Sequence, residues 1–217
     1  MFRNRQEAGE LLAEELLPFR NDPSAILLAL PRGGVAVAYQ LSLALRLPLD
    51  VLITRKIGAP DNPEYALGAV GETGAVYWNR EALSGLSLTE RQLSAAVQAQ
   101  QKEVVRRVAL YRQGRSFPDL HDRTVILVDD GLATGATFFA SVATVRQANP
   151  RRVIGAIPVG PRSTVEVARK LVDQLVVLRI PDPFYAVGNF YRDFGQVEDR
   201  EVLQYLNLAE EAFINKS

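Results

Sequence analysis

The chain contains no cysteine and only one histidine, His121. The lack of cysteine excludes disulfide bonds, thiolate metal ligands and a cysteine nucleophile, and one histidine cannot supply a multi-histidine metal site. A Ser-His-Asp hydrolase would have to use His121, but the sequence has no G-x-S-x-G nucleophile elbow. We therefore interpret His121, within the polar segment 119–123, as a solvated loop residue.

Neither sign of charge is in excess, because lysine plus arginine and aspartate plus glutamate each number 25. A balanced chain has no overall basic field that would attract nucleic acid, so we expect no nucleic-acid partner. The end of the predicted helix at 89–112 is basic. We interpret it as a solvated face whose positive charge the helix dipole favours, with RNA binding as the alternative. Its arginines are Arg106, Arg107, Arg112 and Arg115.

Long apolar runs are also missing. No run reaches the length that spans a membrane, and the first seven residues lack the apolar core of a signal peptide. We expect a cytoplasmic protein with no membrane partner. The length of 217 residues predicts a single domain over 1–217, with a core at about 25–180.

Short buried strands alternate with segments of helical spacing along most of the chain. This alternation predicts an α/β fold with a doubly wound, mostly parallel sheet. In the glycine- and proline-rich segment 57–74, the first half is predicted as a loop and 66–70 as a candidate strand, with 75–78 as its hairpin partner. Strands are predicted at 25–30, 49–54, 125–128, 153–159 and 175–180, and helices at 5–17, 35–45, 89–112, 163–171 and 198–213.

The stretch from Val125 to Thr137 carries the strongest functional signal. Its apolar strand ends in Asp129 and Asp130, and a glycine-containing loop then leads into a helix. In a parallel sheet, ligands bind beyond the carboxyl ends of the strands. Free N–H groups at the helix start favour a phosphate, whereas two adjacent carboxylates suit a vicinal diol.

A phosphate and a diol together describe a ribose 5-phosphate. The spacing matches neither a Walker A loop nor the G-x-G-x-x-G dinucleotide motif. The alternative is an ordinary strand-turn-helix in which Asp130 and Thr134 only cap the helix.

This stretch closely resembles the phosphoribosyl pyrophosphate (PRPP) motif of type I phosphoribosyltransferases. The resemblance implies a magnesium-dependent transfer of the phosphoribosyl group of PRPP to a small nucleophile, usually a nucleobase, with release of pyrophosphate. It also implies that Asp129 and Asp130 touch Mg²⁺ directly or through water. The implied PRPP-binding residues are Asp129, Asp130, Gly131, Ala133, Thr134, Gly135, Ala136 and Thr137.

A second strand-loop-helix junction carries the sequence Pro31-Arg32-Gly33-Gly34. Paired glycines let backbone N–H groups face a ligand, and Arg32 can hold a polyphosphate in a bidentate grip. The resemblance makes this segment the pyrophosphate loop and makes Lys56 the cation that meets the leaving group. A plain helix-initiating turn at 31–34 and a solvated basic strand end at Lys56 are the alternatives. Arg32, Lys56, Asp129 and Asp130 are thus the candidate catalytic residues.

The tail from Pro181 gathers aromatic residues, including Phe184 and Tyr185. By resemblance this tail, about 181–217, and residues 1–20 form a small hood over the acceptor base, because bases stack on aromatic rings. The alternative is that these aromatic rings only seal the end of the sheet. The whole chain also resembles a poorly characterised branch of predicted phosphoribosyltransferases with no settled acceptor.

Two residues depart from the family's motif, and the first of them bears on the acceptor. Several 6-oxopurine enzymes have an aspartate where this chain has Ala133, so the loop resembles the adenine and orotate types. Ala136 replaces a frequent glycine. Three functions remain open: the transferase, a PRPP- or nucleotide-sensing regulator that kept the pocket, and a related hydrolase or phosphorylase. A homodimeric assembly is left open as well.

Overall fold

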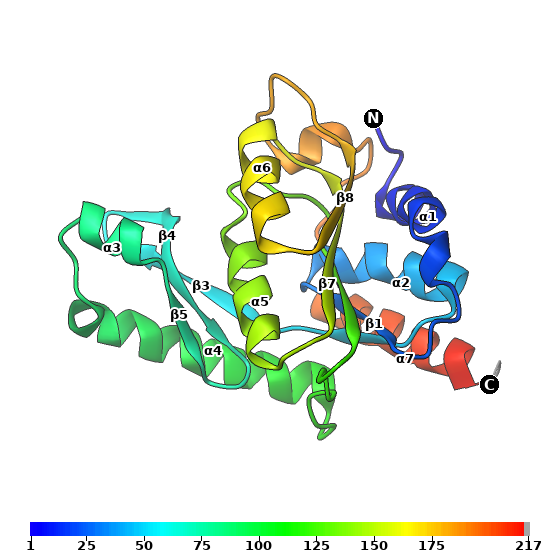
Figure 1. Cartoon of the computed structure of the whole chain (residues 1–217), viewed down its shortest axis with the longest axis horizontal. Coiled ribbons are helices and arrows are strands. Elements are labelled where there is room, and N and C mark those ends of the chain that lie inside the picture. The colour runs from blue at the N-terminus through cyan, green and yellow to red at the C-terminus, as the bar shows by residue number, and fades with distance from the viewer. Residues whose placement is uncertain (215–217) are drawn as a thin grey trace.

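The structure is a computed structural model that describes residues 1–214. Its centre is a five-stranded parallel sheet in the order β2-β1-β6-β7-β8 (Figure 1). This arrangement confirms the predicted α/β fold with a mostly parallel sheet. The strands are β1 (Ala25–Ala29), β2 (Leu49–Val51), β6 (Thr124–Val128), β7 (Arg152–Val159) and β8 (Gln174–Arg179).

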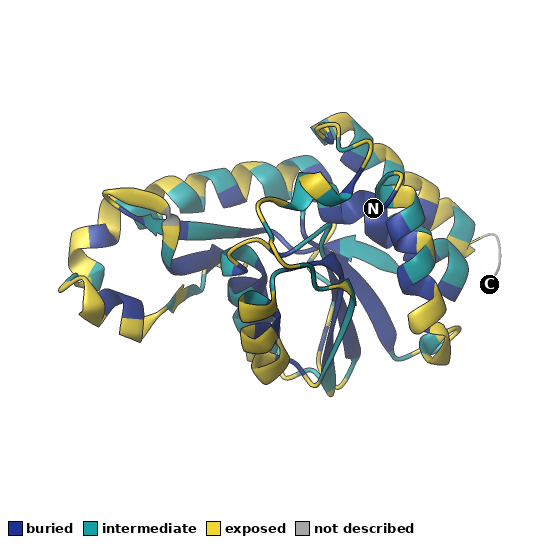
Figure 2. Cartoon of the chain, turned by 90° about the horizontal axis from the view of Figure 1, so that it is seen from above, coloured by how far each residue is buried: buried dark blue, intermediate teal, exposed yellow. Residues whose placement is uncertain are grey.

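Helices cover both faces of this sheet, as expected for a doubly wound fold. Along β1, Ala25, Leu27 and Ala29 belong to one hydrophobic cluster, whereas Ile26 and Leu28 belong to another. The first cluster contains residues of α1 (Arg5–Glu15), α2 (Gly33–Leu45) and α7 (Asp199–Ile214). The second contains residues of α5 (Ala136–Gln147) and α6 (Arg162–Leu171). Figure 2 shows the central strands buried between these layers.

An arm extends from one side of the body (Figure 1). It contains an antiparallel sheet of β3 (Thr54–Ala59), β4 (Asn62–Gly71) and β5 (Val76–Trp78). It also contains α3 (Arg80–Gly85), a 3-10 turn at Glu90–Leu93 and the long helix α4 (Ser94–Arg112). A small hydrophobic cluster of its own holds the arm together, with members Ala59, Leu67, Ala82, Leu83 and Leu93.

The prediction of a loop over the first half of 57–74 was wrong, because β3 and β4 form a hairpin there. Glycine and proline are tolerated in this hairpin where its register shifts, after Ile57 and after Gly58. A Cβ on Gly58 would lie 2.4 Å from the carbonyl oxygen of Pro63, so only glycine allows this approach. The predicted strand at 75–78 is confirmed, since β5 pairs with β4.

A buried ion-pair network joins the base of the arm to the central sheet. Arg112 is 3% exposed and donates to Glu72 Oε1 at 2.9 Å, to Asp50 Oδ2 at 2.7 Å and to the carbonyl of Val51 at 2.7 Å. The interpretation of the α4 arginines as a solvated end was therefore wrong for Arg112. Its partners lie 40 and 62 residues away, which the local sequence pattern could not reveal.

The beginning of the chain meets the tail beyond β8. Phe2 N donates to the carbonyl of Phe190, and Arg192 N donates to the carbonyl of Phe2. The ring of Phe2 also packs against Tyr191, with centroids 5.3 Å apart. The first residues and the tail at 181–197 therefore form one layer next to the sheet. No helix within residues 1–214 is long and apolar enough to cross a membrane.

Candidate functional site

Two strand ends and the arm meet at one edge of the central sheet. Because β1 and β6 are parallel neighbours, with Ala29 opposite Val128, the segments that follow both strands emerge side by side. Leu30 N donates to the carbonyl of Val128 at 2.9 Å and extends this pairing by one residue. The pyrophosphate-loop candidate 31–34 therefore lies against the acid pair. Lys56 reaches the same region from β3 of the arm.

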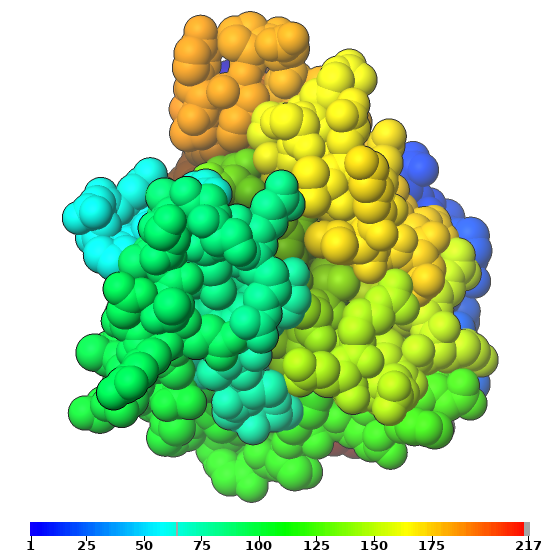
Figure 3. Space-filling view, turned by 60° about the vertical axis from the view of Figure 1, so that its left-hand side comes forward, coloured from blue at the N-terminus to red at the C-terminus, as the bar shows by residue number. Residues whose placement is uncertain are grey.

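A cavity of about 210 Å³ lies at this edge. It is lined by Lys56, Asp129 and most of the loop that leads into α5, namely Gly131, Leu132, Ala133, Thr134, Gly135, Ala136, Thr137 and Phe138. The structure thus brings Lys56 together with the whole predicted phosphate loop, although 73 positions separate Lys56 from Asp129. In Figure 3 the tail, in orange, lies above the junction between the arm and the yellow helix α6.

The start of α5 forms the floor of this cavity. Gly135 precedes the helix with a φ of +76°, a left-handed conformation that favours glycine. Phe139 N donates to the carbonyl of Gly135 and closes the first turn. The N–H groups of Thr137 and Phe138 precede that bond, so helix geometry gives them no intrahelical acceptor. They are donors for an anion at a helix start.

Asp129 and Asp130 point in different directions. Asp129 lines the 210 Å³ cavity, and its Oδ1 accepts a hydrogen bond from the backbone N–H of Asp130. Asp130 Oδ2 instead accepts from Arg5 Nε at 2.7 Å, on the side of the pyrophosphate-loop candidate. Burial, together with the neighbouring charge of Asp130, raises the pKa of Asp129. Burial also raises the pKa of Asp130, although Arg5 opposes that shift.

The paired glycines at the start of α2 pack directly on this acid pair, after a cis peptide bond between Pro31 and Arg32. A Cβ atom on Gly34 would lie 2.7 Å from the carbonyl oxygen of Val128 and 3.0 Å from Asp129 Cα. No larger residue fits at Gly34 unless the loop or the end of β6 shifts. Packing against the end of β6 therefore requires glycine at this position even if the loop binds no ligand.

Arg32 does not line the 210 Å³ cavity. Its Nη1 is 3.7 Å from Glu198 Oε2 and 3.9 Å from Asp199 Oδ1, at the start of α7. Both distances are longer than hydrogen bonds. Arg32 also lines a neighbouring cavity of about 330 Å³ together with Arg5, Gly33, Phe194, Gly195, Gln196 and Val197. This second cavity separates the pyrophosphate-loop candidate from the tail.

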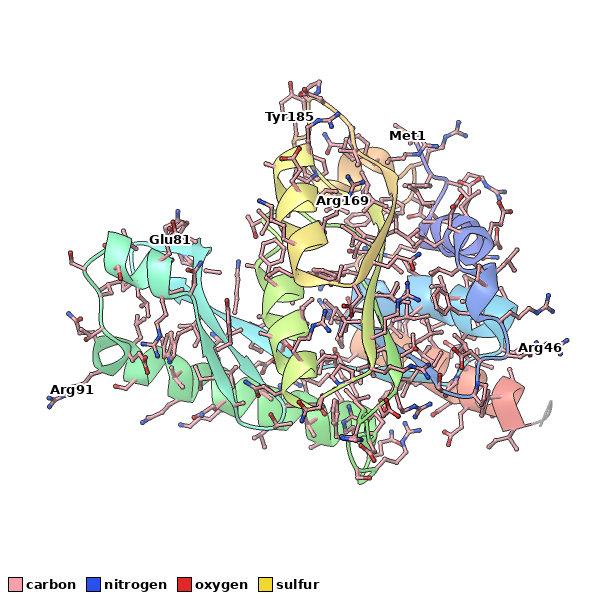
Figure 4. The ribbon with its side chains drawn as sticks, in the orientation of Figure 1. Met1, Arg46, Glu81, Arg91, Arg169 and Tyr185 are labelled. Carbon is pink, nitrogen blue, oxygen red and sulfur yellow. The ribbon has the colours of Figure 1, made fainter. Side chains whose placement is uncertain are left out.

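The tail aromatics pack mainly on one another and on the sheet. Phe184 stacks on Phe190 with centroids 5.4 Å apart, and it packs against the cluster that contains Phe2 and Val159. Tyr185 is 79% exposed and stands at the tip of the tail (Figure 4). The acceptor role of Phe184 and Tyr185 stays a prediction. Val187 of the tail does reach the loop at 131–137, with its Cγ1 2.5 Å from the position of a Cβ on Gly131.

Sequence reasoning missed Arg5 and Tyr191 as members of this site. The Tyr191 hydroxyl donates to the backbone carbonyl of Asp130 at 2.7 Å, and Arg5 binds the Asp130 side chain. Tyr191 lies in the aromatic tail, which the sequence had already indicated as a candidate hood. Arg5 had no comparable signal, because 125 positions separate it from Asp130.

No group of three or more His, Asp or Glu side chains in the described part of the chain could hold a metal ion alone. A magnesium ion does not require such a cage, because it commonly keeps waters and takes oxygens from the phosphates of a substrate. Asp129, the carboxylate that lines the cavity, therefore fits a magnesium site shared with a substrate better than a closed one. His121 is exposed, as expected.

Comparison with known proteins gives a consistent family assignment. A family model described as "Phosphoribosyl transferase domain" matches residues 4–193. Two proteins of Mycobacterium tuberculosis, from strains CDC 1551 / Oshkosh and H37Rv, each carry the name "Putative phosphoribosyl transferase" and are 38% identical over 213 residues. The match covers 98% of this chain and 48% of each relative, so the chain spans about half their length.

A solved structure is also similar. The crystal structure of the protein TT1426 from Thermus thermophilus is 42% identical, with a TM-score of 0.84. The match covers 95% of this chain and 97% of that one. The fold of this chain, including the arm and the tail, therefore has a counterpart of nearly equal extent.

Proposed function

This chain belongs to the phosphoribosyltransferase family, and we propose that it transfers the phosphoribosyl group of PRPP to a nucleobase or a similar small nucleophile, releasing pyrophosphate in a magnesium-dependent reaction. The observation that carries the proposal is the 210 Å³ cavity, which an acid, a cation and a helix start line together. These are the three groups that a sugar diol, a leaving pyrophosphate and a 5-phosphate require.

The 5-phosphate would lie at the start of α5. The N–H groups of Thr137 and Phe138 belong to its first turn, and the Thr134 hydroxyl stands beside them, with Oγ1 3.5 Å from Ala136 N. Backbone donors at a helix start hold a phosphate without any further cation. This fits a loop whose only side chains are small or hydroxylated between Gly131 and Thr137, apart from Leu132.

The ribose would lie between this phosphate and the acid pair. Asp129 and Asp130 would accept hydrogen bonds from its two neighbouring hydroxyls, which fixes the sugar while its anomeric carbon loses the leaving group. Fixing the sugar raises the rate because its anomeric carbon is then already oriented for the attacking group on one side and the leaving group on the other.

The pyrophosphate would lie toward Gly33, Gly34 and Lys56. As its bond to the sugar breaks, negative charge grows on the departing oxygen, and fixed cations and N–H groups stabilise that charge most effectively. Lys56 lies in the cavity wall. Arg32 would have to move from its carboxylate neighbours Glu198 and Asp199, which its long contacts allow.

Magnesium would bind oxygens of the substrate together with Asp129 and Asp130, directly or through water. When bound, the ion neutralises phosphate charge and orients the pyrophosphate. Two carboxylates with pKa values raised by burial gain most from a nearby divalent cation, because a cation favours their ionised forms.

Pyrophosphate release from PRPP and Mg²⁺ across a panel of nucleobases tests the function. We expect release with at least one base, and none from a variant that combines Asp129→Asn with Asp130→Asn. Asp119→Asn is a matched control, because Asp119 precedes β6 and lies at the opposite end of that strand from the site. PRPP binding without release for any base would favour the sensing regulator.

A further inference from the structure

Asp130 is enclosed by segments from three parts of the chain. Arg5 of α1 donates to its Oδ2, Gly33 of α2 packs against the same oxygen, and the Tyr191 hydroxyl donates to its backbone carbonyl. The side chain of Asp130 is only 16% exposed. A carboxylate held this closely has one orientation, which its neighbours determine.

Arg5 is held as firmly as the carboxylate that it binds. Its Nε donates to Asp130 Oδ2 at 2.7 Å, and its Nη1 donates to the carbonyl of Gly195 at 2.8 Å. The guanidinium lies over the Phe194 ring, with Cζ 3.9 Å from the ring centroid. The side chain is 12% exposed. A planar, always charged fork is the group that can make these three contacts at once.

We propose that Arg5 is a positioning residue for the transfer reaction: by binding Oδ2 of Asp130 it fixes the orientation in which this carboxylate meets a ribose hydroxyl. This inference rests on the proposed function, because the hydroxyl belongs to PRPP. Arg5 acts through Asp130 and does not itself touch the sugar. Its charge also favours the ionised form of a largely buried carboxylate, which a hydrogen-bond acceptor for a hydroxyl requires.

The same side chain connects the ribose site with the tail. Phe194 and Gly195 belong to the segment that borders the 330 Å³ cavity, and Arg5 binds both while it binds Asp130. If an acceptor displaced the tail, the Arg5 guanidinium would move with it and would change the position of the Asp130 carboxylate. The assignment explains why a residue of α1 lies at the end of a strand 125 positions away.

The same contacts suit an opposite role, in which Arg5 covers Asp130 and has to leave before PRPP binds. The two roles predict opposite changes in PRPP affinity when the guanidinium is removed. Loss of a positioning group weakens binding, whereas loss of a cover strengthens it. The geometry favours positioning, since leaving would break two hydrogen bonds and a stacking contact together.

Calorimetric titration of the full chain with PRPP in the presence of Mg²⁺ tests the assignment. We expect Arg5→Gln to weaken PRPP binding about 10- to 100-fold, the usual effect of removing a group that orients a ligand-binding side chain. Arg5→Lys should lose less, because it keeps the charge but not the fork. Arg3→Gln is the control, since Arg3 pairs with Glu7 and its side chain is 69% exposed.

A double-mutant cycle separates positioning from a general loss of structure. If Arg5 acts through Asp130, Arg5→Gln adds no further loss of PRPP affinity in the Asp130→Asn background. Additive losses, an unchanged affinity in Arg5→Gln, or tighter binding would each overturn the assignment. Wild-type protein that binds no PRPP would overturn the proposed function as well. Should Arg5→Gln fail to fold, Phe194→Leu removes the ring beneath Arg5 and must weaken binding in the same direction.

Discussion

Gly33 lies so close to Asp130 that a Cβ atom on it would be 1.9 Å from Oδ2 of that carboxylate. The start of α2 and the end of β6 are therefore in contact through a backbone and an acid. Arg5 lies 3.0 Å from the same Cβ position, so the carboxylate cannot simply turn away. The two loops that the resemblance assigns to different parts of PRPP thus form one packed unit.

Gly33→Ala should weaken PRPP binding about 10- to 100-fold, because the added methyl group forces Asp130 or the loop out of position. Calorimetric titration with PRPP and Mg²⁺ measures the change. Gly85→Ala is the matched control, since a Cβ at Gly85 would meet open space. Equal affinities for the two variants would contradict the contact as a determinant of binding.

Asp129→Asn should stabilise the unliganded protein while it abolishes PRPP binding. Burial and Asp130 raise the pKa of Asp129, so ionised Asp129 costs the folded state free energy. Removing that charge is expected to raise the free energy of unfolding by about 0.5–2 kcal/mol. Urea denaturation at pH 7 measures this change, and a decrease would speak against the environment described for Asp129.

The same pKa predicts how stability depends on pH. Above the ordinary value of 3.8, the folded protein keeps a proton on Asp129 that the unfolded chain has already lost. The stabilisation that this proton provides is complete below 3.8 and disappears as the pH rises through the raised pKa. Unfolding free energies measured from pH 4 upward should fall less steeply in Asp129→Asn than in the wild type.

Lys56→Gln should slow pyrophosphate release by about 10²- to 10³-fold, as expected when one group that stabilises developing negative charge is removed. The fall should appear in kcat more than in the KM for the acceptor, because Lys56 lines the cavity beside Asp129 and the phosphate loop. Lys170→Gln on α6 is the control. A rate close to that of the wild type would remove Lys56 from the candidate catalytic residues.

Arg112→Met should lower the free energy of unfolding by about 3–5 kcal/mol, because it leaves the buried carboxylate of Glu72 without its cationic partner. Arg115→Met should change it by less than about 1 kcal/mol, since the Arg115 side chain is 46% exposed and pairs with the exposed Glu210. Chemical denaturation of both variants provides the comparison. Similar values would mean that the buried network does not anchor the arm.

The sequence predicts best what depends on neighbouring residues. The strand, the turn and the helix start at 125–137 are all encoded within one short stretch, and the same holds for 25–45. Both stretches adopt the predicted elements, and the alternation of elements along the chain led to the correct sheet type. The family was likewise recognisable from the acid pair and the loop that follows it.

Features that depend on distant partners were not predicted. The ion pair of Arg5 with Asp130 and that of Arg112 with Glu72 join residues far apart, and each arginine lies within an ordinary helical pattern. The β3-β4 hairpin was missed because its glycine and proline residues are typical of loops, and only pairing across a register shift makes them compatible with strands.

The division of the strands into two separate sheets has a mechanical consequence. Lys56 lies in the sheet of the arm and Asp129 follows a strand of the central sheet, and no ladder hydrogen bonds join these two sheets in the described chain. The separation between this ammonium group and this carboxylate therefore depends on contacts other than strand pairing: Ile57 and Val70 of the arm sheet belong to the main hydrophobic cluster, and Arg112 binds Asp50 of β2. The width of a site divided in this way is therefore held by side-chain packing and by the buried Arg112 network, and not by strand pairing.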